Sequence, residues 1–234
     1  GSQPAQGETP PDAGQTGAGQ AGPGQAGADG EKPHPGAAYC PVCSTWHPGY
    51  LPFGTPPRPG ALCPGCTSLE RHRSLWLYLE RHTDFFASPR LRVLHFAPEA
   101  CLEARFRKML GRGYLTADLA DSRADVRADI TNLQFADASF DAVCCTHVLE
   151  HVPDDAKAMR ELHRVLDAHG IAIIMVPLRG AVTEEDLSLT DPAERTRRYG
   201  QADHVRYYGR DIVGRLEAAG FSVQCVDTGA EFSP

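Results

Sequence analysis

The sequence predicts an α/β protein: a Rossmann-like, doubly wound, mostly parallel sheet with helices on both faces, plus a small N-terminal zinc-binding module. From Arg90 onward, short apolar runs alternate with segments of helical periodicity, as in a parallel sheet that is covered on both faces. Before them, two Cys-x-x-Cys pairs stand in a segment rich in proline and glycine. We therefore expect a tail over 1–36, the zinc module with a linking helix over 37–87, and the sheet domain over 88–234.

The first 36 residues are predicted to form a disordered tail. They hold ten Gly, six Pro, six Ala and five Gln, with no aromatic residue and no Leu, Ile or Val. This composition cannot bury enough apolar surface to offset the entropy of ordering the chain. The remaining 198 residues suffice for one domain of ordinary size and a small appendage.

The cysteine pairs are Cys40 with Cys43 and Cys63 with Cys66, and 19 residues separate them. Four thiolates at this spacing are typical of a tetrahedral zinc site, which has no open position and is therefore structural. Two disulfide bonds are the alternative for the same residues. The other four cysteines lie scattered in apolar or helical segments, which indicates a reducing compartment and favours zinc.

Local patterns predict the elements in order. The capping-box pattern Thr67-Ser-Leu-Glu70 predicts the start of the linking helix. Asp191 followed by proline predicts another helix start, and Gly111 and Gly170 predict helix ends. The expected strands are 91–96, 114–117, 126–130, 140–145, 171–176 and 221–226, and the other expected helices are 102–110, 154–168 and 211–219.

The composition excludes several classes of function. The formal net charge is −7, from 23 basic and 30 acidic residues, and this disfavours a general electrostatic grip on nucleic acid. No apolar run approaches the ~18–20 residues of a membrane span. We therefore expect a cytoplasmic protein that binds neither membranes nor, as its main partner, nucleic acid.

Four loops should carry the chemistry, because ligands of open parallel sheets bind at the carboxyl ends of the strands. These loops are 95–99, the turn after Asp118, the turn from Asp129, and 146–151. Asp118 follows the first loop at the separation along the sequence where an acidic side chain accepts hydrogen bonds from a ribose. The first loop lacks the Gly-x-Gly-x-x-Gly pattern that holds a pyrophosphate, which argues against NAD or FAD.

Three stretches resemble the class I S-adenosylmethionine-dependent methyltransferases, within them the branch called methyltransferase type 11. The stretches are 128–143 (ADITNLQFADASFDAV), 147–154 (HVLEHVPD) and 159–166 (MRELHRVL). The resemblance covers roughly residues 88–226 and is specific over 128–178. Residues 199–206 also resemble a segment of some bacterial members.

The resemblance implies roles for the loop residues toward S-adenosylmethionine. The first loop would line the methionine moiety, Asp118 would bind the ribose hydroxyls and Leu119 would pack on the adenine. Asp129 would accept from the adenine amino group, Ile130 would lie on the ring face, and Thr146 would sit beside the sulfonium. The first loop consists of His95, Phe96, Ala97, Pro98 and Glu99.

The first loop departs from the family pattern, which has an acidic residue followed by Gly-x-Gly. Here His95 stands at the acidic position, and Ala97 and Glu99 stand where the glycines are expected. We expect Ala97 still to permit close approach of the cofactor, and Glu99 to replace the carboxylate by pairing with the cofactor's ammonium group. A degenerate loop that no longer binds cofactor is the alternative, and the protein would then be a catalytically dead scaffold.

The family fold normally finishes with a hairpin that adds an antiparallel strand to the sheet. This sequence stops eight residues after Val226, so the final strand is expected to be missing. A partner or a second copy of the chain is the expected way to complete the sheet edge.

The expected function is methyl transfer from S-adenosylmethionine to a small-molecule, sugar or peptide acceptor in a biosynthetic pathway. His147 and His204 are the candidate general bases, because imidazole titrates near neutral pH. Asp203, Arg206 and Tyr207 would form an acceptor pocket or, equally, a buried network that anchors a lid. The alternative is an RNA methyltransferase whose zinc module grips phosphates through Arg58, Arg71 and Arg73.

Overall fold

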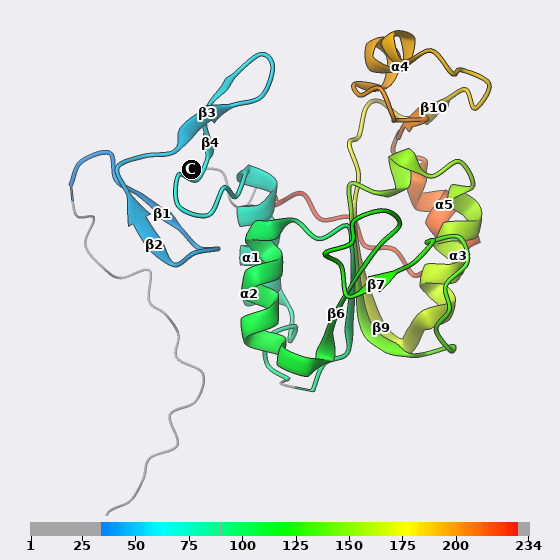
Figure 1. Ribbon diagram of the computed structural model, residues 1–234, viewed down its shortest axis with the longest axis horizontal. Coiled ribbons are helices and arrows are strands. Elements are labelled where there is room, and N and C mark those ends of the chain that lie inside the picture. Colours follow the sequence, from blue (N-terminus) through cyan, green and yellow to red (C-terminus); the bar gives the residue numbers. More distant parts are fainter. Residues whose placement is uncertain (1–33, 89, 229–234) are drawn as a thin grey trace, which may run out of the picture.

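The computed structural model describes residues 34–88 and 90–228 (Figure 1). The predicted tail over 1–36 lies outside these residues, apart from its last three. The described part of the chain comprises a five-stranded sheet with helices, an N-terminal module of two hairpins, and a small segment that follows the last strand of the sheet.

The central sheet is parallel throughout, in the order β7-β6-β5-β8-β9. Its middle strand is fully buried and pairs with one strand on each side, so the order reverses there. This reversal is the topological switch point at which such sheets bind ligands. The strands are β5 (Val93–Phe96), β6 (Tyr114–Asp118), β7 (Val126–Arg127), β8 (Phe140–Thr146) and β9 (Leu166–Met175).

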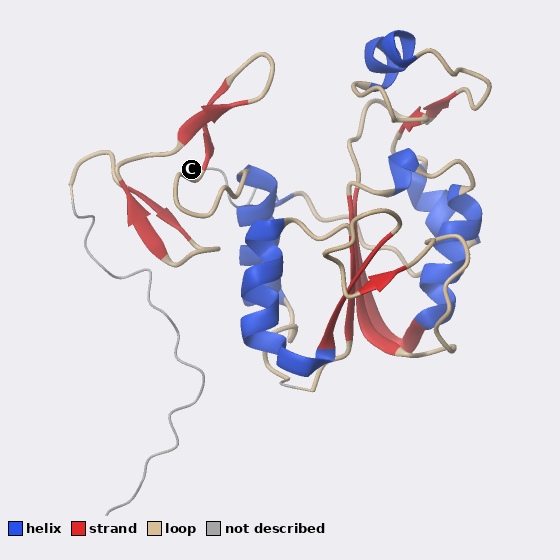
Figure 2. Ribbon diagram, in the orientation of Figure 1, coloured by secondary structure: helices blue, strands red, loops and turns tan. Residues whose placement is uncertain are grey.

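Helices cover both faces of the sheet, as expected for a doubly wound fold (Figure 2). On one face, Trp76 of α1 and Phe106 of α2 stack with ring centroids 6.0 Å apart, within a shared apolar core. On the other face, Met159 and Leu162 of α3 and Leu216 of α5 pack against the sheet. The bounds are Glu70–His82 for α1, Ala100–Leu110 for α2, Asp155–Val165 for α3 and Ile212–Ala218 for α5.

The N-terminal module consists of two short antiparallel hairpins where the sequence predicted an irregular loop. Strands β1 (Ala38–Cys40) and β2 (Thr45–His47) flank the first cysteine pair, and β3 (Leu51–Phe53) and β4 (Arg58–Leu62) lead into the second. Val42 and Cys63 belong to the same apolar cluster as Trp76. The module therefore shares its core with α1 and the sheet.

The linking helix begins at Glu70 with Leu69 as its N-cap, two residues later than the capping-box pattern suggested. Thr67 adopts a positive φ of 62°, and its hydroxyl donates to the carbonyl of Cys66 instead of capping the helix. The backbone N–H of Leu69 donates to Nδ1 of His72 at 3.0 Å. A histidine thus takes the place of the expected acidic capping residue.

Helix α3 ends at Val165 rather than at 168, because Leu166 already pairs with Phe140 of β8. The expected helix stop at Gly170 is therefore wrong, and this glycine lies inside β9. A Cβ atom there would stand 2.8 Å from the carbonyl oxygen of Asp141 and 2.7 Å from Leu166 Cδ1. Glycine is needed at this position for close packing of the strand.

The expected sixth strand over 221–226 is wrong: among the described residues this segment forms no strand. Phe221 packs edge-on against His163 of α3, with ring centroids 5.1 Å apart. An apolar groove of about 780 Å³ lies between the segment and β9, lined among others by Ile171 and Val223. The groove keeps the two backbones apart, so β9 is an edge strand in the described part of the chain.

A small segment between β9 and α5 stands beyond the carboxyl ends of the strands, above α5 in Figure 1. It contains β10 (Glu184–Glu185), α4 (Pro192–Tyr199) and β11 (Arg206–Tyr207). Asp191 caps α4 as predicted, by accepting from the N–H of Ala193 at 3.2 Å. No helix in the described residues is long and apolar enough to cross a membrane.

Candidate functional site

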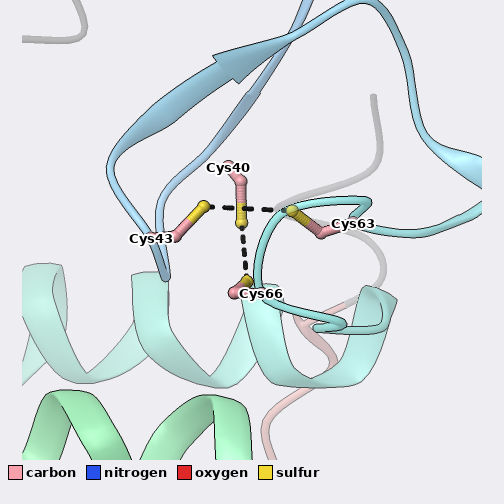
Figure 3. A group of neighbouring side chains, drawn as sticks. All are labelled: Cys40, Cys43, Cys63 and Cys66. Carbon is pink, nitrogen blue, oxygen red and sulfur yellow. Dashed lines mark hydrogen bonds between the residues drawn. The ribbon is translucent and has the colours of Figure 1, made fainter.

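The four predicted zinc ligands converge on one point between the hairpins (Figure 3). The sulfurs of Cys40 and Cys66 are 3.7 Å apart, and those of Cys43 and Cys63 are 3.9 Å apart. A tetrahedral zinc site with bonds of ~2.3 Å requires sulfur separations of ~3.8 Å. All eight cysteines are free, so the disulfide alternative has no support in the structure.

Two polar side chains contact the sulfurs from outside. The Ser68 hydroxyl lies 3.3 Å from the Cys40 sulfur and 3.2 Å from that of Cys66. His47 places Nε2 3.4 Å from the Cys43 sulfur, and only a glycine at 65 leaves room for its ring, since a Cβ there would come within 2.5 Å. Such donors around thiolates are typical of structural metal sites.

The first loop of the sheet domain gathers a buried carboxylate and two imidazoles. Glu99 accepts a 2.7 Å hydrogen bond from the hydroxyl of Thr146, at the end of β8. Its other contacts are Nε2 of His95, at 3.4 Å, and Nε2 of His72, at 3.6 Å, from β5 and α1. Although burial opposes ionisation, these partners lower the pKa of the Glu99 carboxyl well below its usual range.

The neighbours of the two imidazoles determine which nitrogen carries the proton. His72 Nδ1 accepts from the backbone N–H of Leu69, so its Nε2 carries the proton that faces Glu99. His95 Nδ1 lies 2.7 Å from the phenol of Tyr114, whose pKa is raised by burial, so the phenol stays protonated and donates. Glu99 therefore accepts a hydrogen bond from Thr146 of β8 and faces imidazole nitrogens from β5 and α1 at 3.4 and 3.6 Å.

Ala97 adopts a positive φ of 44°, the conformation that the glycine of the family pattern would take. Its backbone N–H donates to the carbonyl of Ala117, which ties the first loop to β6. Phe96 is buried beneath this loop, and Pro98 lines a small cavity of about 90 Å³ with Asp121 of the next loop. The unusual residues thus preserve the backbone shape of the loop.

The predicted cofactor residues follow the carboxyl edge of the sheet in order. Asp118 ends β6, and its Oδ1 accepts from the N–H groups of Ala120 and Asp121, both at 2.7 Å. Leu119 is 60% exposed, and Ile130 is buried under the next turn. Asp129 is exposed, and hydrogen bonds from Thr131 lower its pKa.

His147 and Glu150 lie together in the turn after β8. His147 adopts a positive φ of 54°, and its N–H donates to the carbonyl of Met175 in β9. Its Nδ1 lies 3.3 Å from Oε1 of Glu150, a carboxylate that is almost completely buried. The His147 ring is partly exposed at the carboxyl edge of the sheet.

His204 and Asp203 contact the same turn from the segment before β11. The His204 and His151 rings meet edge to face, with centroids 4.6 Å apart. His204 is buried, its Nδ1 lies 2.8 Å from the carbonyl of Tyr199, and burial lowers its pKa. The exposed Asp203 lies 3.1 Å from Nδ1 of His151.

Arg206 anchors the turn rather than facing a pocket, which corrects its assignment to an acceptor site. Its side chain is buried and donates to the carbonyls of Leu149, Val152 and Pro153 and to the carboxylate of Glu185. Four of its five guanidinium N–H groups thus bond within the protein. The guanidinium of Arg179 lies over the ring of Tyr207, 4.4 Å from the ring centroid, and Tyr207 remains partly exposed.

Two of the three arginines that would grip RNA are engaged within the protein. Arg73 is buried, donates to the carbonyls of Ala61 and Ser68, and stacks on Tyr50 at 3.9 Å. Arg58 forms a bidentate ion pair with Glu70, donating from Nε and Nη2 to the two carboxylate oxygens. These contacts do not favour phosphate binding by Arg58 and Arg73.

Sequence reasoning missed His72 and Tyr114 as parts of the site. His72 stands between Arg71 and Arg73 in the sequence, a charge pattern typical of a solvated helix face, yet it is only 5% exposed. Its position within the first turn of α1, three residues after Leu69, was the available signal, since it points the ring back toward the module. Tyr114 carried no signal beyond its place at the start of β6.

Residues 107–174 match the family model described as methyltransferase domain. The match covers 68 of the 234 residues, so over this part the sheet domain is similar to a methyltransferase domain. Its Rossmann-like fold and its N-terminal cysteine cluster agree with the expectations from sequence.

Relatives of this sheet domain include sequences and structures of low similarity. An uncharacterised protein of Methanocaldococcus jannaschii is 38% identical over 60 residues, so the match spans 26% of each chain. The crystal structure of the YcgJ protein of Bacillus subtilis has a TM-score of 0.50 at 20% identity, covering 67% of this chain and 71% of that one. A methyltransferase of Mesorhizobium loti has a TM-score of 0.45 at 18% identity, covering 66% and 84%. At 20% identity the YcgJ structure shows the fold alone.

Proposed function

We propose that this protein is an S-adenosylmethionine-dependent methyltransferase acting on a small-molecule, sugar or peptide acceptor. The observation that carries the proposal is the order of side chains along the carboxyl edge of the sheet. The carboxyl ends of β5, β6, β7 and β8 carry, in turn, Glu99, Asp118, Asp129 and Thr146. The resemblance assigns contacts with this cofactor to these residues. The match to the methyltransferase domain supports it.

The cofactor would lie across the ends of β5 and β6. Asp118 would accept from the ribose hydroxyls through Oδ2, because its Oδ1 already holds the following turn. The exposed Leu119 is available to pack on the adenine ring. Glu99 places a carboxylate beside the imidazole of His95, and its Oε2 makes no hydrogen bond, so it has capacity for the ammonium group of the cofactor.

Methyl transfer requires mainly that the acceptor atom is aligned with the methyl group, since the sulfonium is already a good electrophile. The acceptor would approach from the turn after β8, where the His147 ring is partly exposed. His147 would take the proton of an acceptor hydroxyl or amine as the methyl group transfers. The lowered pKa of His204 leaves that ring neutral, and its buried Nε2 faces the same turn.

We also propose that Cys40, Cys43, Cys63 and Cys66 bind a structural Zn²⁺. The sulfur separations suit a tetrahedral site, and a closed site of four thiolates leaves no position for substrate. Its contribution would be to hold the start of α1, and with it His72, against the cofactor loop.

Calorimetric titration with S-adenosylmethionine and S-adenosylhomocysteine tests the proposal. We expect micromolar dissociation constants for the wild-type protein, and Asp118→Ala to weaken both ligands by ~10–100-fold through loss of charge-assisted hydrogen bonds. Asp118→Asn should show a similar loss while keeping the turn, because its amide oxygen still accepts from the backbone.

Asp167→Ala is the matched control. Asp167 also accepts from the N–H two residues ahead, that of His169, but it lies near the start of β9, at the opposite end of the sheet. Its affinity for cofactor should equal that of the wild type. A folded wild-type protein that binds neither ligand would refute the proposal and favour the catalytically dead scaffold.

His147→Ala should lower turnover by ~100-fold or more while leaving cofactor affinity within a factor of two. The acceptor would first be identified by screening alcohols, amines, sugars and peptides with methyl-labelled cofactor. The comparison variant is His163→Ala, which removes an imidazole from α3 far along the chain from the turn. Equal turnover of the His147 variant and the wild type would assign His147 a packing role only.

A further inference from the structure

We propose that Glu150, His151 and His204 form a binding site for a divalent transition-metal ion. The first two belong to the turn after β8, and the third precedes β11. One ligand atom from each lies within 4.8 Å of the others. Bonds of ~2.0–2.2 Å to imidazole nitrogen and carboxylate oxygen place two ligand atoms ~3.4 Å apart in tetrahedral coordination, so an ion would draw these atoms together by up to ~1.4 Å.

Two of the three side chains are buried and carry an unsatisfied acceptor. Glu150 is 1% exposed, and its Oε2 has no hydrogen-bond partner. His204 is 3% exposed, and its Nε2 likewise has none. Because the Tyr199 carbonyl can only accept, His204 Nδ1 carries the proton and Nε2 offers a lone pair. A carboxylate oxygen and a lone pair cannot satisfy each other, whereas a cation between them satisfies both.

The outer contacts of both imidazoles are those of metal-bound histidines. His204 Nδ1 faces the Tyr199 carbonyl at 2.8 Å, and His151 Nδ1 faces a carboxylate oxygen of Asp203 at 3.1 Å. A histidine ligand almost always donates its second ring N–H to a carbonyl or carboxylate, which orients the ring and leaves the other nitrogen for the metal. His204 and His151 both direct Nδ1 at an oxygen atom of the protein, so Nε2 of each ring remains available for a metal ion.

The two segments that carry the ligands are held together independently of any ion. The backbone N–H of Val205 donates to the carbonyl of Glu150 at 3.0 Å. The buried guanidinium of Arg206 bonds the carbonyls of Leu149 and Pro153, which flank Glu150 and His151. The ligands are thus positioned on a rigid support before an ion binds, which lowers the entropic cost of binding.

Two imidazoles and one carboxylate suit zinc, manganese or ferrous iron rather than calcium or magnesium. Three protein ligands leave coordination positions open, and the partly exposed His151 places them toward solvent at the carboxyl edge of the sheet. The next step rests on the proposed function. One open position on the ion would bind the oxygen of an acceptor hydroxyl and lower the pKa of that hydroxyl. The O–H bond then breaks with its proton passing to His147 or water, the O–CH₃ bond forms, and the S–CH₃ electron pair stays on sulfur.

Metal uptake by the full chain tests the site. After dialysis against a zinc buffer, the wild-type protein should hold one equivalent of zinc more than Glu150→Gln or His151→Gln, and Cys63→Ser should lose a different equivalent. Manganese titration followed by electron paramagnetic resonance then isolates this site, since Mn²⁺ does not compete for four thiolates. We expect Mn²⁺ affinity to fall by at least ~100-fold in either variant.

Glu217→Gln and His169→Gln are the matched controls, because both residues are exposed and lie outside the cluster. They should take up metal as the wild type does. Since His151 is only partly buried, its variant should keep the wild-type thermal unfolding, which separates lost binding from lost folding.

Equal metal content and Mn²⁺ affinity in the wild type and both cluster variants would overturn the site, as would a wild type that takes up only the thiolate-bound equivalent. Cofactor calorimetry separates this result from the proposed function. Metal uptake without cofactor binding would sustain the site and refute methyl transfer. Cofactor binding without uptake would do the reverse.

Discussion

Cys63→Ser is expected to release zinc and unfold the N-terminal module. Structural zinc contributes ~10 kcal/mol or more of folding free energy in small modules, comparable to the whole stability of a domain, ~5–15 kcal/mol. Around the thiolates the two hairpins bury few apolar side chains of their own, among them Val42 and Ala61. Metal analysis, thermal unfolding and limited proteolysis of residues 37–66 measure the effect.

The loss should extend to the cofactor site. Ser68 contacts two of the sulfurs, and its carbonyl accepts from Arg73 and from the N–H of Cys63. This turn places His72 against Glu99, so its disorder should weaken S-adenosylmethionine binding by ~10-fold, or about 1.4 kcal/mol. The sheet domain itself should stay folded, since its second core, on the side of α3 and α5, contains no residue of the module.

Cys225→Ser is the matched control for this prediction. Cys225 is an exposed free cysteine outside the cluster, so its variant should retain zinc, stability and cofactor affinity. A Cys63→Ser protein with wild-type zinc content and an unchanged unfolding curve would refute a structural zinc site. Zinc loss with unchanged cofactor affinity would instead confine the role of the metal to the module.

Short-range patterns made the sheet and the cysteine cluster predictable. An apolar run such as Val93–Phe96 is buried on both faces whichever partner it pairs with, so its sequence alone identifies the strand. Likewise, two cysteines three residues apart bring their thiolates together through local geometry. The β5–α2–β6 unit could therefore be assigned almost to the residue.

The failures depend on contacts that the sequence does not display. Residues 221–226 have the pattern of a strand, but strand formation needs a partner at hydrogen-bonding distance, and a groove separates them from β9. Arg206 had the chemistry of a substrate ligand, yet it bonds three carbonyls from a turn far away in the sequence and the carboxylate of Glu185. The role of His72 depends in the same way on a loop of another module.

Glu99→Gln is expected to be the most damaging single change at the cofactor site. The substitution removes the negative charge that faces the Nε2–H groups of His72 and His95. The amide that replaces the carboxylate has only one oxygen that can accept a hydrogen bond. Loss of the carboxylate should raise the dissociation constant of S-adenosylmethionine by ~100-fold, or about 2.7 kcal/mol. We also expect a loss of about 2 kcal/mol in the free energy of unfolding, because buried donors lose their acceptor.

Two further variants separate the charge of Glu99 from its packing. Thr146→Val removes only the hydroxyl that donates to Glu99, and should cost about 1 kcal/mol of stability with a smaller loss of affinity. Glu80→Gln, at an exposed position of α1, should behave as the wild type. If Glu99→Gln loses stability but binds cofactor normally, the carboxylate serves only to join α1, β5 and β8. If it loses affinity more steeply than stability, as we expect, Glu99 supplies in the first loop the negative charge that His95 has displaced from its usual position in the family.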